Sequence, residues 1–253
     1  MVLHVLIILA ISTVLVLLAS SVATVLFLRQ SALALDLYDD FEGPTYKITD
    51  NQTSPNGKWL NKYSGFGSSG TVTIKSLSPS DRNNTVLYQE PKTSTSLNET
   101  HGALTLTTQT YQDVEMSLKV KTHKQLRQNS APNPWEVAWI ILRYQDDWHH
   151  YYFILKPNGV ELGKKQNENR AEEQIFLHTA NEPKLKIDEW NTWHIKMSGN
   201  HIEIWLKMAD ESWQQVIDYR DNSPMVGPGN IGLYTEDAHV EFDDVYIASA
   251  FND

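Results

Sequence analysis

The sequence predicts an all-β protein, a two-sheet antiparallel sandwich preceded by one N-terminal hydrophobic helix. Beyond Leu35, apolar residues alternate with polar ones in short runs separated by Gly, Pro, Asn and Asp, which is typical of half-buried antiparallel strands. Before Leu35 the chain is almost wholly apolar from Val2 to Leu28. We therefore expect two regions, a hydrophobic segment at residues 1–34 and one β domain at residues 35–253.

The hydrophobic segment predicts that the rest of the chain is exported. It contains no Asp, Glu or Lys, and its one Arg, Arg29, follows the apolar run. The run reaches the roughly 20 residues that span a bilayer, yet Ala32-Leu33-Ala34 has the small-x-small form of a signal-peptide cleavage site. The sequence leaves both alternatives open, an uncleaved membrane anchor and a cleaved signal peptide. In either case we expect the β domain outside the cell, membrane-anchored or secreted.

Charge and composition narrow the classes of partner. The chain has 21 Lys and Arg against 31 Asp and Glu, a formal net charge of −10, which disfavours nucleic acid because such binding relies on cations that neutralise phosphates. Cys is absent, so disulfides, thiol catalysis and thiolate metal sites are excluded. Asn51, Asn83 and Asn98 begin N-x-S/T sequons, which predict a glycoprotein if the chain is exported.

Ten segments alternate clearly enough to predict strands, and their spacing predicts a sandwich of two sheets. Two tight connections, Lys156-Pro157-Asn158-Gly159 and Ser198-Gly199-Asn200-His201, are expected to close hairpins. The polar stretches Asn51–Ser69 and Gln125–Pro134 are expected to be long surface loops. The predicted strands are Leu104–Thr108, Val114–Lys121, Val137–Tyr144, Tyr151–Lys156, Val160–Lys164, Thr192–Met197, Ile202–Lys207, Trp213–Tyr219, Ile231–Thr235 and Val240–Ala248.

Three motifs stand in order along the β domain: WEVAWIILRYQDDWHHYYFILKPNGVELGKK, EWNTWHIKMSGNHIEIWL and GNIGLYTEDAHVEFDDVYIAS. Together they resemble the concanavalin A-like lectin/glucanase superfamily jelly roll, most closely its laminin G-like and 3-keto-disaccharide hydrolase-like branch, over most of Asp39–Ala248. The resemblance implies two curved antiparallel sheets and a concave surface that binds sugar chains in many relatives, with a structural calcium ion in some. A fold of this kind does not settle function.

Carboxylates crowd both ends of the β domain, and we predict Asp40, Glu42, Asp243 and Asp244 as metal ligands. Similar jelly rolls pair their terminal strands, which would bring the two acidic groups together. Like charges repel unless a cation neutralises them, and Ca²⁺ is the cation that prefers oxygen ligands. The alternative is a solvated acidic rim that binds no ion.

A groove that binds a polysaccharide or other glycan is the second predicted site. Strand alternation places Trp139 and Arg143 on the face opposite the core filling. Aromatic rings stack on the apolar faces of sugars, and charged groups pair with sugar hydroxyls. The alternative is ordinary packing, with Arg143 and Glu115 as a cross-strand ion pair. The predicted ligand-binding residues are Trp139, Arg143, Trp148, His150, Tyr152 and Glu115.

No catalytic residue can be assigned from the sequence. Glycoside hydrolysis generally uses two carboxylates, and Asp113 and Glu115 share one face of a predicted strand in QDVEMS. Catalytic relatives in the glucanase branch carry E-x-D-x-x-E there, and this chain lacks the third acid. We therefore favour an exported carbohydrate-binding or adhesive module. The alternatives are a glycan-degrading enzyme, 3-keto-glycoside hydrolase-like or lyase, and a structural envelope protein that uses the sandwich for protein contacts.

Overall fold

A computed structural model describes residues 35–65, 70–78, 81–167 and 173–249 of the chain. Every element in these residues is a strand, and the strands form two antiparallel sheets, so the all-β sandwich prediction is confirmed. The predicted N-terminal helix, which includes the proposed anchor or signal, lies outside the described residues. Within the described part of the chain, no helix has the length and apolarity needed to cross a bilayer.

All ten predicted strands are present, most of them longer than expected, together with seven further strands. The observed strands are β1 (Leu35–Asp39), β2 (Tyr46–Ile48), β3 (Gln52–Thr53), β4 (Trp59–Ser64), β5 (Thr71–Ser78), β6 (Asp81–Glu90), β7 (Gly102–Tyr111), β8 (Val114–Gln125), β9 (Ala138–Asp146), β10 (His149–Lys156), β11 (Gly159–Gln166), β12 (Ile175–Ala180), β13 (Asn191–Ser198), β14 (His201–Lys207), β15 (Trp213–Arg220), β16 (Gly229–Glu236) and β17 (Ala238–Ser249).

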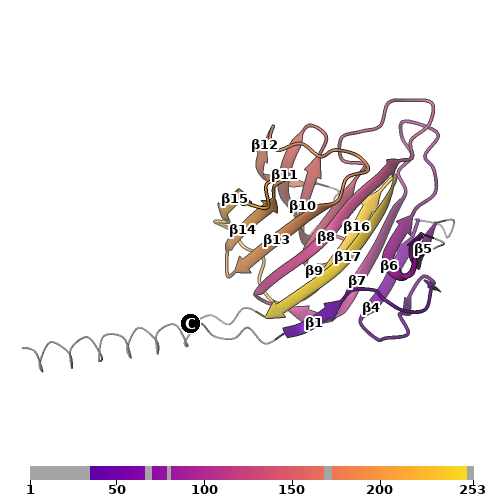
Figure 1. Ribbon diagram of the computed structural model, residues 1–253. Coiled ribbons are helices and arrows are strands. Elements are labelled where there is room, and N and C mark those ends of the chain that lie inside the picture. The colour runs from indigo at the N-terminus through magenta and orange to yellow at the C-terminus, as the bar shows by residue number, and fades with distance from the viewer. Residues whose placement is uncertain (1–34, 66–69, 79–80, 168–172, 250–253) are drawn as a thin grey trace, which may run out of the picture. The chain divides into compact units, whose positions relative to one another are not determined.

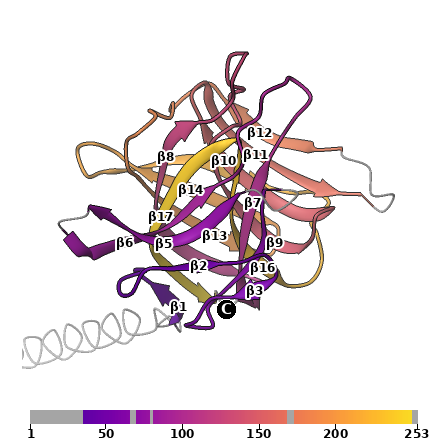
Figure 2. The same cartoon turned by 90° about the vertical axis from the view of Figure 1, so that its right-hand side faces the viewer.

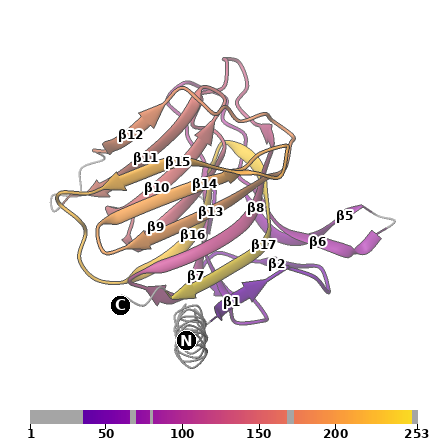
Figure 3. The same cartoon turned by 60° about the vertical axis from the view of Figure 1, so that its left-hand side comes forward.

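The first sheet has the order β15-β14-β13-β8-β17-β6-β5-β2, and β1 also pairs with β17. Figure 1 shows the long strand β17 lying between β8 and β6. The second sheet has the order β12-β11-β10-β9-β16-β7-β4-β3. Figure 3 shows the two sheets as stacked layers, and in Figure 2 the β5–β6 hairpin extends from one end of them.

The core lies between the two sheets. Trp193, Ile195 and Met197 alternate as the buried residues of β13. The ring of Trp193 meets the ring of Phe153 from β10 edge-on, with centroids 5.0 Å apart. Each such buried side chain contributes roughly 1.5–3 kcal/mol to the free energy of unfolding. Because Phe153 faces the core, its neighbours Tyr152 and Ile154 face outward on the second sheet.

Both predicted hairpins are present. Lys156 pairs with Gly159 between β10 and β11, and Ser198 pairs with His201 between β13 and β14. Each connection has two central residues, and Gly159 and Gly199 adopt positive φ, which glycine tolerates without strain.

The stretch Asn51–Ser69 is not the surface loop that its composition suggests. It contains β3 and β4, and β4 pairs with β7. Trp59 of β4 is fully buried, and its indole Nε1 donates to Asp39 Oδ2 at 2.7 Å. The polar residues that suggested a loop form the turn before β4, while Trp59 supplies the apolar surface that makes β4 a core strand.

Candidate functional site

The outer face of the second sheet carries a cavity of about 900 Å³. Its floor comes from β9, β10 and β16, and its walls from β4, β7, β11, β12, the β8–β9 loop and the β9–β10 turn. The central strands β9 and β10 are buried on both faces. A strand exposed to water on one face would alternate, so the cavity floor is packed as tightly as the core side.

Aromatic side chains dominate the lining of the cavity. Trp139 packs against Tyr152 and Tyr234, with ring centroids 5.0 and 5.4 Å away. Its Nε1 donates to the carbonyl oxygen of Trp135 at 2.8 Å, which fixes the β8–β9 loop over the sheet. At the rim, Trp135 is 43% and Phe176 61% exposed. Exposed rings beside buried ones suit a ligand with an apolar face.

Carboxylates with tyrosine partners provide the polar lining. Tyr234 Oη donates to Glu236 and Tyr144 Oη donates to Asp147, each at 2.7 Å. Glu161 accepts a hydrogen bond from Tyr152 Oη at 3.0 Å and forms an ion pair with Lys156. These contacts set acceptor oxygens at several points around the cavity.

A carboxyl group and an imidazole in the cavity have strongly shifted pKa values because of burial. Burial raises the pKa of Glu236 to about 7, although the Tyr234 hydrogen bond and Lys165 oppose the shift. Burial lowers the pKa of His150 to about 4, so this imidazole is neutral at physiological pH. The ammonium of Lys165 lies 5.7 Å from the ring centroid of Trp148, the favourable geometry of a cation over an indole face.

The structure brings half of the predicted ligand-binding residues to this cavity. Trp139, Trp148 and His150 line it. Tyr152 is fully buried beneath Trp139 and supports that ring from below. Arg143 and Glu115 lie elsewhere, and both expectations need correction.

Arg143 is not in the groove because the strand alternation breaks at this residue. It has a φ of 48°, and the pairing of β16 with β9 shifts register nearby. Its buried guanidinium donates to Asp113 Oδ1 at 3.1 Å and to the carbonyl oxygens of Gln112, Met225 and Gly199. The same irregularity turns Tyr144, which regular alternation from Trp139 would place on the core face, toward the cavity.

Glu115 lies on β8 of the first sheet and therefore cannot share a surface with Trp139 of the second sheet. Its carboxylate lies 3.3 Å from Nε2 of His194 on β13. The ion pair of Glu115 with Arg143, which was the alternative to a binding site, does not form, and Arg143 pairs with Asp113 instead.

The pairing of β1 with β17 brings the four predicted metal ligands into one region, but no three of them have ligand atoms within 4.8 Å of one another. Burial raises the pKa of Asp243 to about 6, and the charges of Asp244 and Glu42 raise it further. The other carboxylates already have partners within the protein. Lys119 forms an ion pair with Asp244 at 2.5 Å, and the Thr85 amide donates to Glu42 at 3.3 Å. Asp40 accepts the Glu42 amide at 3.2 Å. The residues fit a cation only in part, because Lys119 already neutralises one of the four carboxylates.

Among the described residues, one cluster does have its ligand atoms within 4.8 Å of one another, His201, Glu203 and Asp218 on β14 and β15. His201 Nε2 lies 2.7 Å from Asp218, and its Nδ1 lies 3.7 Å from Glu203. The imidazole thus already hydrogen-bonds one of the two carboxylates, Asp218.

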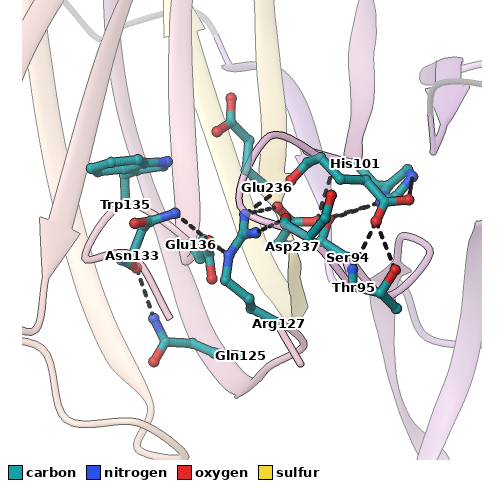
Figure 4. Close-up of polar contacts among 12 residues, drawn as sticks. Ser94, Thr95, His101, Gln125, Arg127, Asn133, Trp135, Glu136, Glu236 and Asp237 are labelled. Atoms are coloured by element: carbon teal, nitrogen blue, oxygen red, sulfur yellow. Dashed lines mark hydrogen bonds and ion pairs between the residues drawn. The ribbon is translucent and has the colours of Figure 1, made fainter. Parts of the chain in front are cut away.

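A buried polar network lies behind Glu236 and was not foreseen (Figure 4). The guanidinium of Arg127 bonds Glu136 Oε1 at 2.5 Å and Asp237 Oδ2 at 3.1 Å. It also donates to the carbonyl oxygens of Ser96 and Glu99. One cation thereby ties together the loop before β7, the β8–β9 loop and the turn from β16 to β17.

Ser94, His101 and Asp237 in this network resemble a nucleophilic triad in composition but not in geometry. Ser94 Oγ lies 2.9 Å from His101 Nδ1 and also bonds Asp237. A working triad uses the two imidazole nitrogens for the two partners, whereas here both partners meet Nδ1. Ser94 is fully buried, so the group holds loops together.

Sequence reasoning missed Glu236, Tyr234, Glu161, Lys165 and Trp135 as cavity residues. Trp135 directly follows the predicted loop Gln125–Pro134. A Trp beside a surface loop is itself a sequence signal of a binding site. Glu236 stands beside Asp237 in the motif GLYTEDAHVEF. Groups distant in the sequence, Lys165 of β11 and Glu136 of the β8–β9 loop, act on its carboxyl, and local sequence pattern does not predict that.

Solved structures confirm the jelly-roll sandwich of the concanavalin A-like type. The chain is similar to the carbohydrate binding module CBM66 from Bacillus subtilis, with a TM-score of 0.51 and 14% identity over 80% of this chain and 99% of that one. It is similar to the VIP36 exoplasmic/lumenal domain in its Ca²⁺/Man3GlcNAc-bound form, with a TM-score of 0.52 and 10% identity over 86% and 92%.

A GH43 protein from Bacillus licheniformis is also similar, with a TM-score of 0.51 and 10% identity over 84% of this chain, which spans 39% of that protein. No curated protein matches the chain significantly. A family model for the 3-keto-alpha-glucoside-1,2-lyase-like domain matches residues 50–248, which include every strand from β3 to β16 and nearly all of β17. The chain therefore belongs to the 3-keto-alpha-glucoside-1,2-lyase-like domain family.

Proposed function

We propose that this protein is an exported carbohydrate-binding jelly roll whose ligand occupies the cavity on the outer face of the second sheet. The observation that carries the proposal is the lining itself, rings of Trp135, Trp139 and Phe176 beside hydrogen-bonding carboxylates. Sugars combine apolar C–H faces with hydroxyls and need both kinds of partner. The carbohydrate-binding module and the glycan-bound lectin domain among the similar folds support this proposal.

Titration calorimetry with neutral and mannose-containing oligosaccharides tests the proposal. Trp135→Ala and Trp148→Ala should each weaken binding about tenfold or more, since removing a stacked ring costs on the order of 1.4 kcal/mol or more. Both residues belong to the rim, so truncation leaves the cavity floor in place. Trp139→Ala and Tyr152→Ala are poorer tests because these rings are 4% and 0% exposed and their loss would disturb folding.

The matched control is Trp213→Ala. Trp213 is 48% exposed, close to the 43% of Trp135, but it lies on β15 of the first sheet. The proposal expects this variant to bind as the unaltered protein does. Equal losses in all three variants, or no binding of any oligosaccharide, would overturn it.

A second candidate function, cleavage of a glycan, is favoured by the family match. The family description names a lyase of 3-keto-glucosides, and the cavity offers carboxyl groups that such chemistry requires. Mass spectrometry after incubation with oligosaccharides or 3-keto-glucosides separates cleavage from simple binding. Shorter sugar products indicate cleavage, and unchanged sugars indicate binding alone.

We further propose that residues 1–34 export the domain, either as an anchor or as a cleaved signal, and that the acidic group at β1 and β17 takes up calcium. N-terminal sequencing of the natural protein distinguishes the two export modes. For calcium, an ion bound only by the native state must raise the melting temperature. A melting temperature that neither calcium nor EDTA moves would contradict the calcium proposal.

A further inference from the structure

We propose that Glu236 is the proton donor for cleavage of a glycosidic bond in the cavity. This inference rests on the proposed glycan binding, and it names the acting residue for the cleavage given above as the second candidate function. Glu236 ends β16 and lines the cavity, and its carboxylate accepts the Tyr234 hydroxyl at 2.7 Å. In Figure 4 its side chain points away from the Arg127 network.

The backbone around Glu236 is held in place. Asp237 has a φ of 44°, a left-handed conformation that allows the chain to leave the second sheet and enter the first. Its amide donates to the carbonyl oxygen of His101 at 2.9 Å, and its own carbonyl oxygen accepts the Leu126 amide at 2.7 Å. These contacts hold the backbone next to Glu236, and the Tyr234 hydroxyl orients its carboxylate, as a catalytic acid needs.

The charges around Glu236 favour a bound proton. Asp237 and Glu136 lie behind it, and the single guanidinium of Arg127 serves both of them. Glu136 Oε2 is buried without a hydrogen-bond partner. These carboxylates add to the effect of burial on the pKa of Glu236, while Lys165 on β11 opposes it. An acid that exchanges its proton near neutral pH is suited to general acid catalysis.

The other titratable groups that line the cavity with Glu236 are tyrosines, the carboxylates Asp147 and Glu161, the ammonium groups of Lys156 and Lys165, and His150. Tyr63 on β4 and Tyr234 on β16 have pKa values raised well above the usual range by burial, with contributions from Glu236 and Asp147. Both phenols therefore stay protonated and act as hydrogen-bond donors. His150, whose pKa burial lowers, adds no charge at neutral pH.

The proposed reaction needs only the glycoside, Glu236 and water. The bond from the anomeric carbon to the leaving oxygen breaks, its electron pair goes to that oxygen, and the oxygen takes the proton of Glu236. Water then adds to the anomeric carbon and gives one proton to the Glu236 carboxylate, which restores the acid. The products are two shorter sugars, and no oxidant or reductant takes part.

The test measures binding and turnover on the same full-length preparations. The probes are gluco-, manno- and xylo-oligosaccharides, 3-keto-glucosides, and 2,4-dinitrophenyl glycosides of the same sugars. Glu236→Gln keeps the size of the side chain and its acceptor oxygen but has no proton to donate. Turnover of oligosaccharides should fall by about 10²–10⁴-fold, whereas dinitrophenyl glycosides, whose leaving group needs no proton, should lose much less. Turnover of the unaltered protein should fall as the pH rises above about 7.

The control is Glu203→Gln on the first sheet, which should behave as the unaltered protein. Equal losses on both substrate types in Glu236→Gln would overturn the assignment of Glu236 as the acid. Tight binding without turnover of any probe would overturn the activity and leave the proposed glycan binding intact. Absence of both binding and turnover would overturn both proposals.

Discussion

At the scale of single residues, the least expected feature is the fully enclosed guanidinium of Arg127. Sequence patterning placed it in a surface loop, whereas its side chain is 1% exposed and joins three segments through Glu136, Asp237 and two carbonyl groups. A buried charge persists only when its partners satisfy it, and removal of one partner leaves the rest uncompensated. The loops around the cavity thus depend on one cation.

We expect Arg127→Met to lower the free energy of unfolding by roughly 3–5 kcal/mol, because Glu136 and Asp237 would remain buried without their partner. Urea denaturation measures the change. Arg220→Met is the matched control, since Arg220 is exposed on the edge strand β15, and such a change should stay within about 0.5 kcal/mol. Comparable stability of the two variants would show that the network contributes little.

At the scale of elements, tight hairpins and irregular strands decide which side chains reach the cavity. The β10–β11 hairpin holds Lys156 against Glu161, and the irregularity at Arg143 brings Tyr144 to the lining. Gly159 closes that hairpin with a φ of 132°, and a methyl group there would overlap the carbonyl oxygen of Ala180 on β12. Gly159 is therefore required for two reasons, its positive φ and the close approach of β12.

Gly159→Ala and Gly43→Ala separate these two effects. Gly43 has nearly the same φ, 128°, but nothing lies within 4 Å of an added methyl group. Both variants carry the backbone strain of a non-glycine residue, on the order of 1–3 kcal/mol, and Gly159→Ala alone adds the overlap with β12. Thermal unfolding should show Gly159→Ala as clearly the less stable of the two. Similar melting temperatures would mean that β12 moves aside freely.

At the scale of the whole molecule, burial of acids links stability to pH. Glu236 and Asp243 have pKa values raised to about 7 and about 6 by burial. A folded state that binds protons more tightly than the unfolded chain is stabilised at low pH and loses that stabilisation as pH rises through the folded-state pKa. His150 acts in the opposite direction, because its lowered pKa makes stability fall as pH drops through about 4.

We therefore expect Glu236→Gln to reduce the loss of stability that the unaltered protein shows between pH 5 and pH 8, leaving the part that Asp243 contributes. The raised pKa corresponds to at most roughly 3 kcal/mol over that interval. Urea denaturation at both pH values measures it, and Glu203→Gln serves as control. An unchanged pH dependence in Glu236→Gln would mean that the carboxyl titrates normally.

The sequence by itself determined the class of fold, ten of the strands and both tight hairpins, because alternation of apolar residues and turn chemistry are local properties of the chain. It also selected Trp139 and His150, since a regular strand fixes the faces of its residues, and Trp148 in the turn between β9 and β10. Only the tertiary structure decided that Arg143 leaves the groove, that β4 is a core strand, and that Glu236 lies in the cavity. Each of these outcomes depends on a strand irregularity or on burial by segments far away in the chain. Local sequence periodicity predicts neither of them.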